Sequence, residues 1–171
     1  MEFQYAANNF VLDWIKSGKF LDLACGNCQL LDYAKSKGCE VVGIDINPQR
    51  NEIIKHNLNN PLPFQNELFD IVACIDSLEH VKNVSQVFTE VYRVLKSGGI
   101  FIVTVPNTKW YKNHNHISYF TYKYMLQLIK YSGFEILGER HYVEIPKIHK
   151  RFVFKWFPEI CFHFVFKLVK K

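Results

Sequence analysis

The sequence lacks any uncharged apolar run near the roughly 18 residues that a membrane-spanning helix needs. It also lacks a basic N-terminal head followed by an apolar stretch, so residues 1–10 do not read as a secretory leader. Its five cysteines are an odd number, which argues against a full set of disulfide pairs. We therefore expect a reduced, cytoplasmic protein that does not span a membrane.

Internal repeats, low-complexity tracts and linkers are also missing, and 171 residues suit one domain covering residues 1–171. Instead, strand-like and helix-like segments alternate, which is typical of βαβ units in an α/β fold. The expected strands are apolar on both faces, as covered parallel strands are, and lie at Phe20–Ala24, Glu40–Ile44, Phe69–Ile75 and Ile100–Val105. The expected helices lie at Phe10–Ile15, Gln29–Lys37, Gln49–Asn57, Val84–Lys96 and Thr121–Ser132.

The formal charge of +5 is concentrated at the C-terminal end, where Lys147 to Lys171 holds seven Lys and Arg residues against Glu159 alone. The same segment is rich in aromatic residues, a mixture that favours an anionic lipid surface. No nucleic-acid-binding motif accompanies it, and we expect no nucleic-acid partner. We interpret residues 147–160 as a basic and aromatic surface insertion, with a short interfacial helix at Phe152–Phe157 as one hypothesis and ordinary surface chain as the alternative.

The most informative segment is FLDLACGNCQLL, from Phe20 to Leu31, taken together with the acid that ends VVGID. An apolar strand enters a small-residue turn that opens a helix, and Gly26 lets backbone approach a ligand closely there. Asp45 follows the neighbouring strand, where its two oxygens can accept hydrogen bonds from both hydroxyls of a ribose. The pattern predicts a nucleoside site. The alternative is a plain strand-to-helix turn at residues 45–48.

Four further stretches, LPFQNELFDIV, DSLEHV, EVYRVLKSGG and FIVTVPN, occur in the order and spacing of the class I S-adenosylmethionine-dependent methyltransferases. Over about residues 10–142 the chain resembles the small-molecule, UbiE-like branch of that family. The resemblance implies a Rossmann-like three-layer α/β/α sandwich with a seven-stranded, mostly parallel sheet and an antiparallel last strand. Phe134–Val143 and Phe162–Val169 would form the closing antiparallel hairpin.

The resemblance also implies S-adenosylmethionine as cofactor and S-adenosylhomocysteine as product. The methionine part would lie against Ala24, Cys25 and Gly26, near Asp22. The adenosine part would contact Asp45 at the ribose, Ile46 beside the adenine, and Asn57 and Leu58 at the adenine edge. Ile75 and Asp76 would face the sulfonium and the substrate, although an ordinary strand end explains them equally.

For chemistry, we predict methyl transfer to a small molecule, with a sugar or lipid-linked acceptor suggested by analogy alone. His80 is the candidate base or positioning group, assisted by Asp76, because imidazole titrates near neutrality; a structural pair with Glu79 is the alternative. Asn107 and His116 are the candidate substrate contacts. The alternative function is a catalytically silent cofactor-binding module, because Ala24 and Cys28 stand where the family usually has glycine.

Two other chemistries fit single motifs. Cys25-Gly26-Asn27-Cys28 has the spacing of a redox pair or half a zinc site, but its second half is missing, and no metal ligands are predicted. Tyr119 and Lys123 have the spacing of the catalytic pair in short-chain dehydrogenases, whose N-terminal glycine pattern is absent. Peripheral membrane contact through the C-terminal segment is a further hypothesis, and the oligomeric state is left open.

Overall fold

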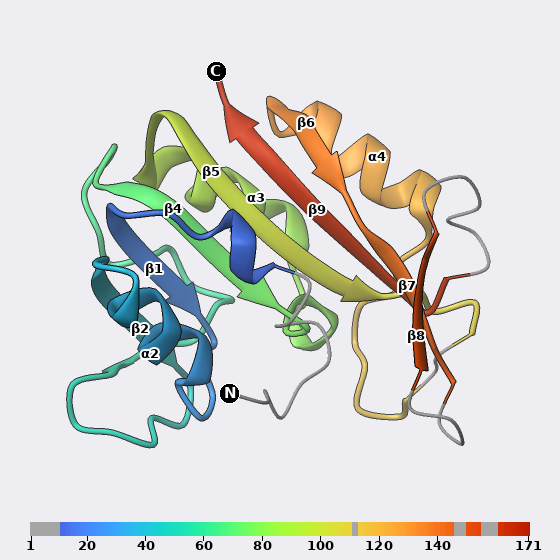
Figure 1. Cartoon of the computed structure of the whole chain (residues 1–171), viewed down its shortest axis with the longest axis horizontal. Coiled ribbons are helices and arrows are strands. Elements are labelled where there is room, and N and C mark those ends of the chain that lie inside the picture. The colour runs from blue at the N-terminus through green and yellow to red at the C-terminus, as the bar shows by residue number, and fades with distance from the viewer. Residues whose placement is uncertain (1–10, 111–112, 146–149, 155–160) are drawn as a thin grey trace.

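A mixed β-sheet forms the centre of the computed structural model, which describes residues 11–110, 113–145, 150–154 and 161–171. The described part has nine strands in the order β3-β2-β1-β4-β5-β9-β7-β8, with β6 also paired to β9 (Figure 1). The strands are β1 (Lys19–Leu23), β2 (Glu40–Asp45), β3 (Ile54–Lys55), β4 (Phe69–Ile75), β5 (Leu95–Pro106), β6 (Phe134–Glu139), β7 (His141–Ile145), β8 (Lys150–Phe154) and β9 (His163–Lys170). The helices are η1 (Leu12–Trp14), α2 (Gln29–Ser36), η2 (Leu78–His80), α3 (Val84–Val94) and α4 (Tyr122–Tyr131).

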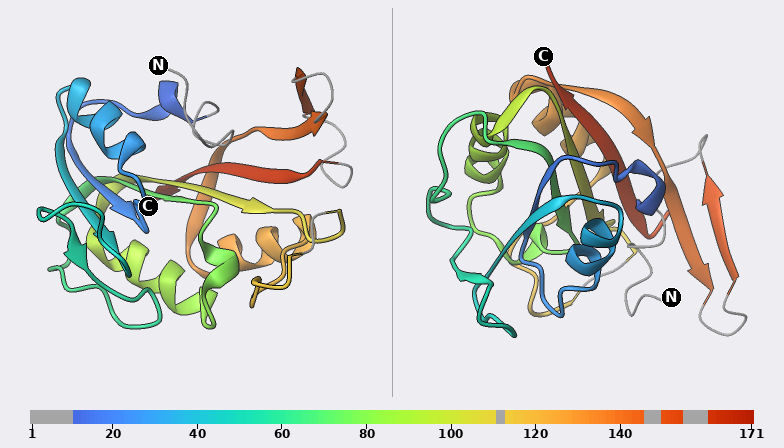
Figure 2. Two further views of the ribbon diagram at one scale, coloured as in Figure 1. Left: turned by 90° about the horizontal axis from the view of Figure 1, so that it is seen from below. Right: turned by 60° about the vertical axis from the view of Figure 1, so that its left-hand side comes forward.

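Helices cover both faces of the sheet, with α2 and η1 on one side and α3 and α4 on the other (Figure 2). The side chains of each strand alternate between the two helical layers, because successive side chains of a strand point to opposite faces of the sheet. In β5, for example, Phe101 and Val103 pack in the cluster with α3 and α4, whereas Ile102 packs in the cluster with α2. The predicted three-layer α/β/α sandwich is confirmed.

The parallel part of the sheet follows the predicted strands closely. β4 has the predicted bounds, β1 begins and ends one residue earlier than predicted, and β2 ends one residue later. β1 pairs in parallel with β2 on one side and with β4 on the other. Apolar runs of this kind are local signals, which explains why the sequence is sufficient to place them.

Two predicted helices are wrong. No helix occupies Gln49–Asn57; this segment is turns followed by β3, whose Ile54 and Lys55 pair in parallel with the end of β2. Nine residues are too few for a helix to be stable without tertiary packing, and here the pairing with β2 is favoured instead. The leading segment forms only the short 3₁₀ turn η1, and Phe10 lies outside the described residues.

The chain leaves α3 earlier than predicted, because Leu95 already has extended backbone angles and begins β5. Asn83 caps the start of α3 by accepting a hydrogen bond from the backbone N–H of Gln86 at 3.2 Å. Gly98, with φ +74°, lies in an irregularity of β5 and does not end the helix.

The antiparallel end of the sheet is confirmed and more elaborate than predicted. β9 lies between β5 and β6 and is antiparallel to both. The expected strand Phe134–Val143 is divided between β6 and β7, and β8 is an additional strand paired with β7, which raises seven strands to nine. The hypothetical interfacial helix is therefore wrong at Phe152–Phe154, which belong to β8, and its remainder lies outside the described residues.

Candidate active site

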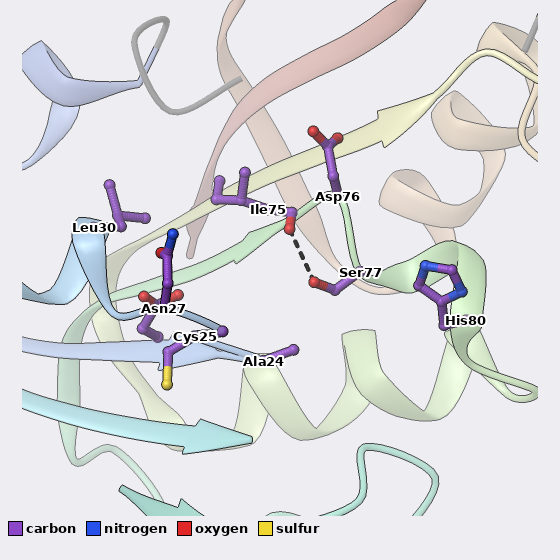
Figure 3. Close-up of a pocket in the computed structure, with 10 residues that line it drawn as sticks. Ala24, Cys25, Asn27, Leu30, Ile75, Asp76, Ser77 and His80 are labelled. Carbon is purple, nitrogen blue, oxygen red and sulfur yellow. Dashed lines mark hydrogen bonds between the residues drawn. The ribbon is translucent and has the colours of Figure 1, made fainter. Parts of the chain in front are cut away.

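A cavity of about 250 Å³ opens at the carboxyl ends of β1 and β4 (Figure 3). Here the strand order reverses, since the chain passes from β1 outward to β2 and β3 and then returns to β4 on the other side of β1. Ligands in open α/β sheets bind at such a switch point. The cavity is lined by Asp22, Ala24, Cys25, Gly26, Asn27, Leu30, Ile75, Asp76, Ser77 and His80.

Gly26 and Asp45 are joined directly at the edge of this cavity. The backbone N–H of Gly26 donates to Oδ2 of Asp45 at 2.9 Å, and the N–H of Asn47 donates to Oδ1 at 2.8 Å. Gly26 has φ +50°, and a Cβ built on it would meet no atom within 4 Å. The turn therefore presents bare main chain to open space, with a carboxylate beside it.

Asp22, near the end of β1, also lines the cavity and is only 3% exposed. Burial, and secondly the charge of Asp45, raises the pKa of its carboxyl to about 8. A carboxyl in this state would be stabilised as carboxylate by a nearby cation, such as an ammonium group. Asp22, Gly26 and Asp45 thus fit a ligand that has a cationic end and a diol.

Ala24 and Cys28, which replace the glycines of the family pattern, have φ values of +57° and +65°. Side-chain-bearing residues adopt this left-handed conformation at a cost of about 1 to 2 kcal/mol each. The thiol of Cys28 is fully buried and does not line the cavity, so the substitution strains the turn without filling the site.

At the end of β4, Asp76 also has a positive φ, of +45°. Its Oδ1 accepts a hydrogen bond from Oγ1 of Thr104 at 2.7 Å and lies 3.9 Å from Nε2 of His163. His163 begins β9 and stacks on the ring of Tyr142 with centroids 4.9 Å apart. The antiparallel end of the sheet therefore brings a histidine to the predicted sulfonium-facing acid.

A second polar cluster surrounds His80 on the exposed side of the cavity. The rings of His80 and His116 lie edge to face with centroids 5.4 Å apart. Burial, with the neighbouring His80 and His163, lowers the pKa of His116 below its usual value. Glu79 is 4% exposed, and burial together with the charge of Asp76 raises its pKa to about 8.

Several predicted site residues lie outside the cavity lining. Ile46 is 53% exposed, and Leu58 packs against the core beside α3 and α4. The side-chain oxygen of Asn57 accepts two hydrogen bonds from Asn59, each 2.9 Å long. Asn107 is buried, and its Nδ2 donates to the backbone oxygen of Cys161 at 2.8 Å, which gives it a structural contact.

Asn27, Leu30 and Ser77 line the cavity but are not among the predicted site residues. The place of Asn27 inside the glycine turn is a signal that could have found it. His163 is also absent from the prediction, because no local motif marks it. Glu79 was named only as the structural partner of His80.

The competing motifs find less support in this geometry. The sulfur atoms of Cys25 and Cys28 lie 3.8 Å apart, and both cysteines are buried free thiols. The pKa of each thiol is raised, chiefly by burial. Tyr119 is 57% exposed, and neither it nor Lys123 lines the cavity. Among the described residues, no helix is long and apolar enough to cross a bilayer.

The fold is a Rossmann-like α/β fold with a cavity at its switch point, and sequence comparison shows which family the chain resembles. Residues 21–103 match the family model described as a methyltransferase domain. This segment is 83 of the 171 residues, and over it the comparison assigns to the chain a similarity to methyltransferase domains.

Individual relatives agree with this assignment. The chain is 38% identical over 109 residues to the protein MJ1252 of Methanocaldococcus jannaschii, which covers 56% of this chain and 41% of that protein. It is 28% identical to the sterol 4-C-methyltransferase strm-1 of Caenorhabditis elegans, over 85% of this chain and 50% of the relative. The chain thus spans half or less of the length of these curated relatives.

A solved structure of similar fold is the 1,6-didemethyltoxoflavin-N1-methyltransferase of Burkholderia thailandensis, with its bound substrate and S-adenosylhomocysteine. It superposes with a TM-score of 0.73 at 16% identity, covering 98% of this chain and 80% of that chain. At this identity the likeness concerns the fold.

Proposed function

We propose that the protein transfers a methyl group from S-adenosylmethionine to a small-molecule acceptor. The observation that carries the proposal is the contact between Gly26 and Asp45, 2.9 Å long, at a cavity that the buried Asp22 also lines. In this proposal Asp45 exchanges part of its contact with backbone for the ribose hydroxyls, and Asp22 pairs with the ammonium of the methionine end.

The cofactor, when bound, supplies an electrophilic methyl group on a sulfonium. The protein then has to orient an acceptor in line with that methyl and accept or guide its proton. Ile75 and Asp76 line the cavity at the end of β4, and His80 lines it on η2 (Figure 3). We assign acceptor binding to this side of the cavity, with His116 next to His80.

The loop between β5 and α4 supports a proposal on the acceptor class. Its Trp110, Ile117 and Tyr119 are 51%, 53% and 57% exposed, and Ile117 donates a backbone hydrogen bond to the oxygen of Glu79 beside the cavity. Exposed apolar side chains next to a polar site suit an acceptor with an apolar part. We therefore propose a lipid-linked or otherwise amphipathic acceptor, such as a lipid-linked sugar.

The same surface supports a proposal on location. An amphipathic acceptor would bring the protein to a membrane surface, and the basic segment 147–160 would contribute charge attraction to anionic lipids. We propose a cytoplasmic protein, peripheral at the inner membrane surface, whose residues 1–171 act as one methyltransferase domain.

Binding of S-adenosylhomocysteine tests the cofactor site. At about 100 times its Kd this ligand should raise the melting temperature by roughly 5 to 10 °C for a chain of this size. Asp45→Ala should lose that rise. Asp32→Asn, which changes an aspartate that pairs with Arg50 at 2.6 Å and is not among the cavity-lining residues, is the matched control and should keep it. An unchanged melting temperature in the original protein would refute the proposal.

A catalytically silent binding module on the same fold is the second candidate, favoured by the strained φ values of Ala24 and Cys28. Turnover separates the two. Incubation with S-adenosylmethionine and soluble or lipid-linked sugars, with S-adenosylhomocysteine measured by mass spectrometry, should show acceptor-dependent product. Ligand binding without product for any acceptor of either class would favour the silent module.

A further inference from the structure

Three side chains with metal-ligating atoms converge beside the cavity, although the sequence analysis predicted no metal site. Glu79 and His80 belong to η2, and His116 comes from the loop between β5 and α4. One ligand atom from each lies within 4.8 Å of the other two. We propose that this cluster binds a divalent first-row transition-metal ion of the Zn²⁺ type at the mouth of the cofactor cavity.

Backbone hydrogen bonds hold the two elements together. The N–H groups of Ile117 and Ser118 both donate to the backbone oxygen of Glu79, at 2.7 and 3.0 Å. The hydroxyl of Ser118 donates to the backbone oxygen of Val81 at 2.6 Å. The loop that carries His116 is therefore fixed to η2 by three bonds, and the three ligands meet without a large rearrangement of the backbone.

The orientation of His80 suits a metal ligand. Its Nδ1 lies 3.1 Å from the backbone oxygen of Asn115, and because a carbonyl can only accept, Nδ1 carries the proton. Nε2 is then left with its lone pair. Metal-binding histidines are usually held in this way, with the second ring nitrogen donating to a carbonyl or carboxylate.

Glu79 supplies the independent sign of a missing ligand. It is 4% exposed, and its Oε2 is buried with no hydrogen-bond partner among the described residues. Buried polar atoms are nearly always paired, because an unpaired one retains its desolvation cost. A cation bound between Oε2 and the two imidazoles would satisfy it.

The donor set selects the type of ion. Two imidazoles and one carboxylate suit Zn²⁺ and its first-row neighbours, whereas Mg²⁺ and Ca²⁺ prefer oxygen ligands. With metal–ligand bonds of about 2.1 Å, ligand atoms lie about 3 to 4 Å apart, so separations of up to 4.8 Å need to contract by at most about 1 to 2 Å. The exposed side chain of His80 can make that movement.

The consequence for catalysis rests on the proposed function. An ion here would bind the oxygen of a hydroxyl acceptor and lower its pKa, so that the O–H proton passes to water. The new O–C bond would then form as the S–C bond of the methyl donor breaks. His80 would act as a ligand in place of a general base, and oxygen would be the acceptor atom.

Metal binding can be measured without the reaction. Equilibrium dialysis against Zn²⁺ or Co²⁺, followed by elemental analysis, should find one ion per chain, and a large excess of Mg²⁺ should not displace it. Glu79→Gln and His116→Asn should each weaken binding at least about 100-fold, since loss of even an outer partner costs 10- to 100-fold. His114→Asn, in the same loop but exposed, is the matched control and should bind normally.

The outcomes distinguish this inference from the proposed function. Binding that survives in both Glu79→Gln and His116→Asn, or that disappears in a Cys25→Ser and Cys28→Ser double variant, overturns the metal site. Absence of binding by the folded original protein does the same. S-adenosylhomocysteine binding, measured on the same samples, tests the proposed function separately, so either proposal can fail alone.

Discussion

Replacing Asp22 by asparagine should remove the pH dependence that this buried carboxyl imposes on the free energy of unfolding. Its pKa is raised from 3.8 to about 8 in the folded protein, chiefly by burial and secondly by Asp45. Between those two values the folded state holds a proton that the unfolded state has released. The contribution of Asp22 to the free energy of unfolding is therefore greatest below about pH 4 and is lost as the pH rises toward 8.

The size of the effect follows from about 1.4 kcal/mol per pKa unit. Between pH 5 and pH 8, the titration of Asp22 should lower the free energy of unfolding of the original protein by about 3 to 4 kcal/mol. This figure allows for the smaller slope near pH 8, where the folded carboxyl itself ionises. Asparagine cannot ionise, so its effect on the free energy of unfolding does not change with pH. The stability of Asp22→Asn relative to the original protein should rise by the same amount across that interval.

Urea unfolding at pH 5, 6, 7 and 8, extrapolated linearly to water, measures this difference. The difference between the two proteins is the informative quantity, because Glu79 also has a raised pKa and contributes equally to both. Asp32→Asn serves as control, since Arg50 lowers the pKa of that exposed aspartate and its loss should not produce a rise. Parallel pH profiles for Asp22→Asn and the original protein would refute the reasoning.

Three further substitutions test the turn, its contact with Asp45 and the packing of β2. Asp45→Ala should lower the free energy of unfolding by about 1 to 2 kcal/mol, because Gly26 and one other backbone donor lose their acceptor. Urea unfolding without ligand measures this loss, and no change would show that the two contacts do not stabilise the fold. Ala24→Gly should raise stability by about 0.5 to 1 kcal/mol by relieving a φ of +57°, and a loss of stability in the same assay would contradict the strain. Gly43→Ala should lower the free energy of unfolding by about 1 to 3 kcal/mol, because the new Cβ would lie 2.7 Å from Cδ1 of Ile53. A melting temperature equal to that of the original protein would show that Ile53 can move aside without loss of stability.

The cofactor half of the site could be predicted because its parts are local. Asp22 and Gly26 lie in one short segment, and Asp45 ends the next strand along the chain. Parallel pairing of β1 with β2 then places the carboxyl ends of both strands at the same edge of the sheet. The contact between Gly26 and Asp45 confirms that placement, while the ligand roles of these residues stay predictions.

The misses have a common cause, which is contact between distant segments. Ile54 joins the sheet as β3 because β2 offers it an edge, and no local periodicity announces that pairing. His163 reaches Asp76 only because β9 runs antiparallel beside β5, with Pro106 opposite His163. The sequence does not reveal how β9 pairs with β5, so from the sequence alone His163 is an isolated histidine in an aromatic strand.

Different parts of the chain therefore form the two halves of the cavity. The glycine turn and Asp45 depend on β1 and β2, whereas the proposed acceptor side combines η2, the loop before α4 and the start of β9. A substitution such as His116→Asn changes the second group without touching Gly26 or its bond to Asp45. Cofactor affinity and acceptor choice should then vary independently, which is the physical condition for one fold to methylate many different molecules.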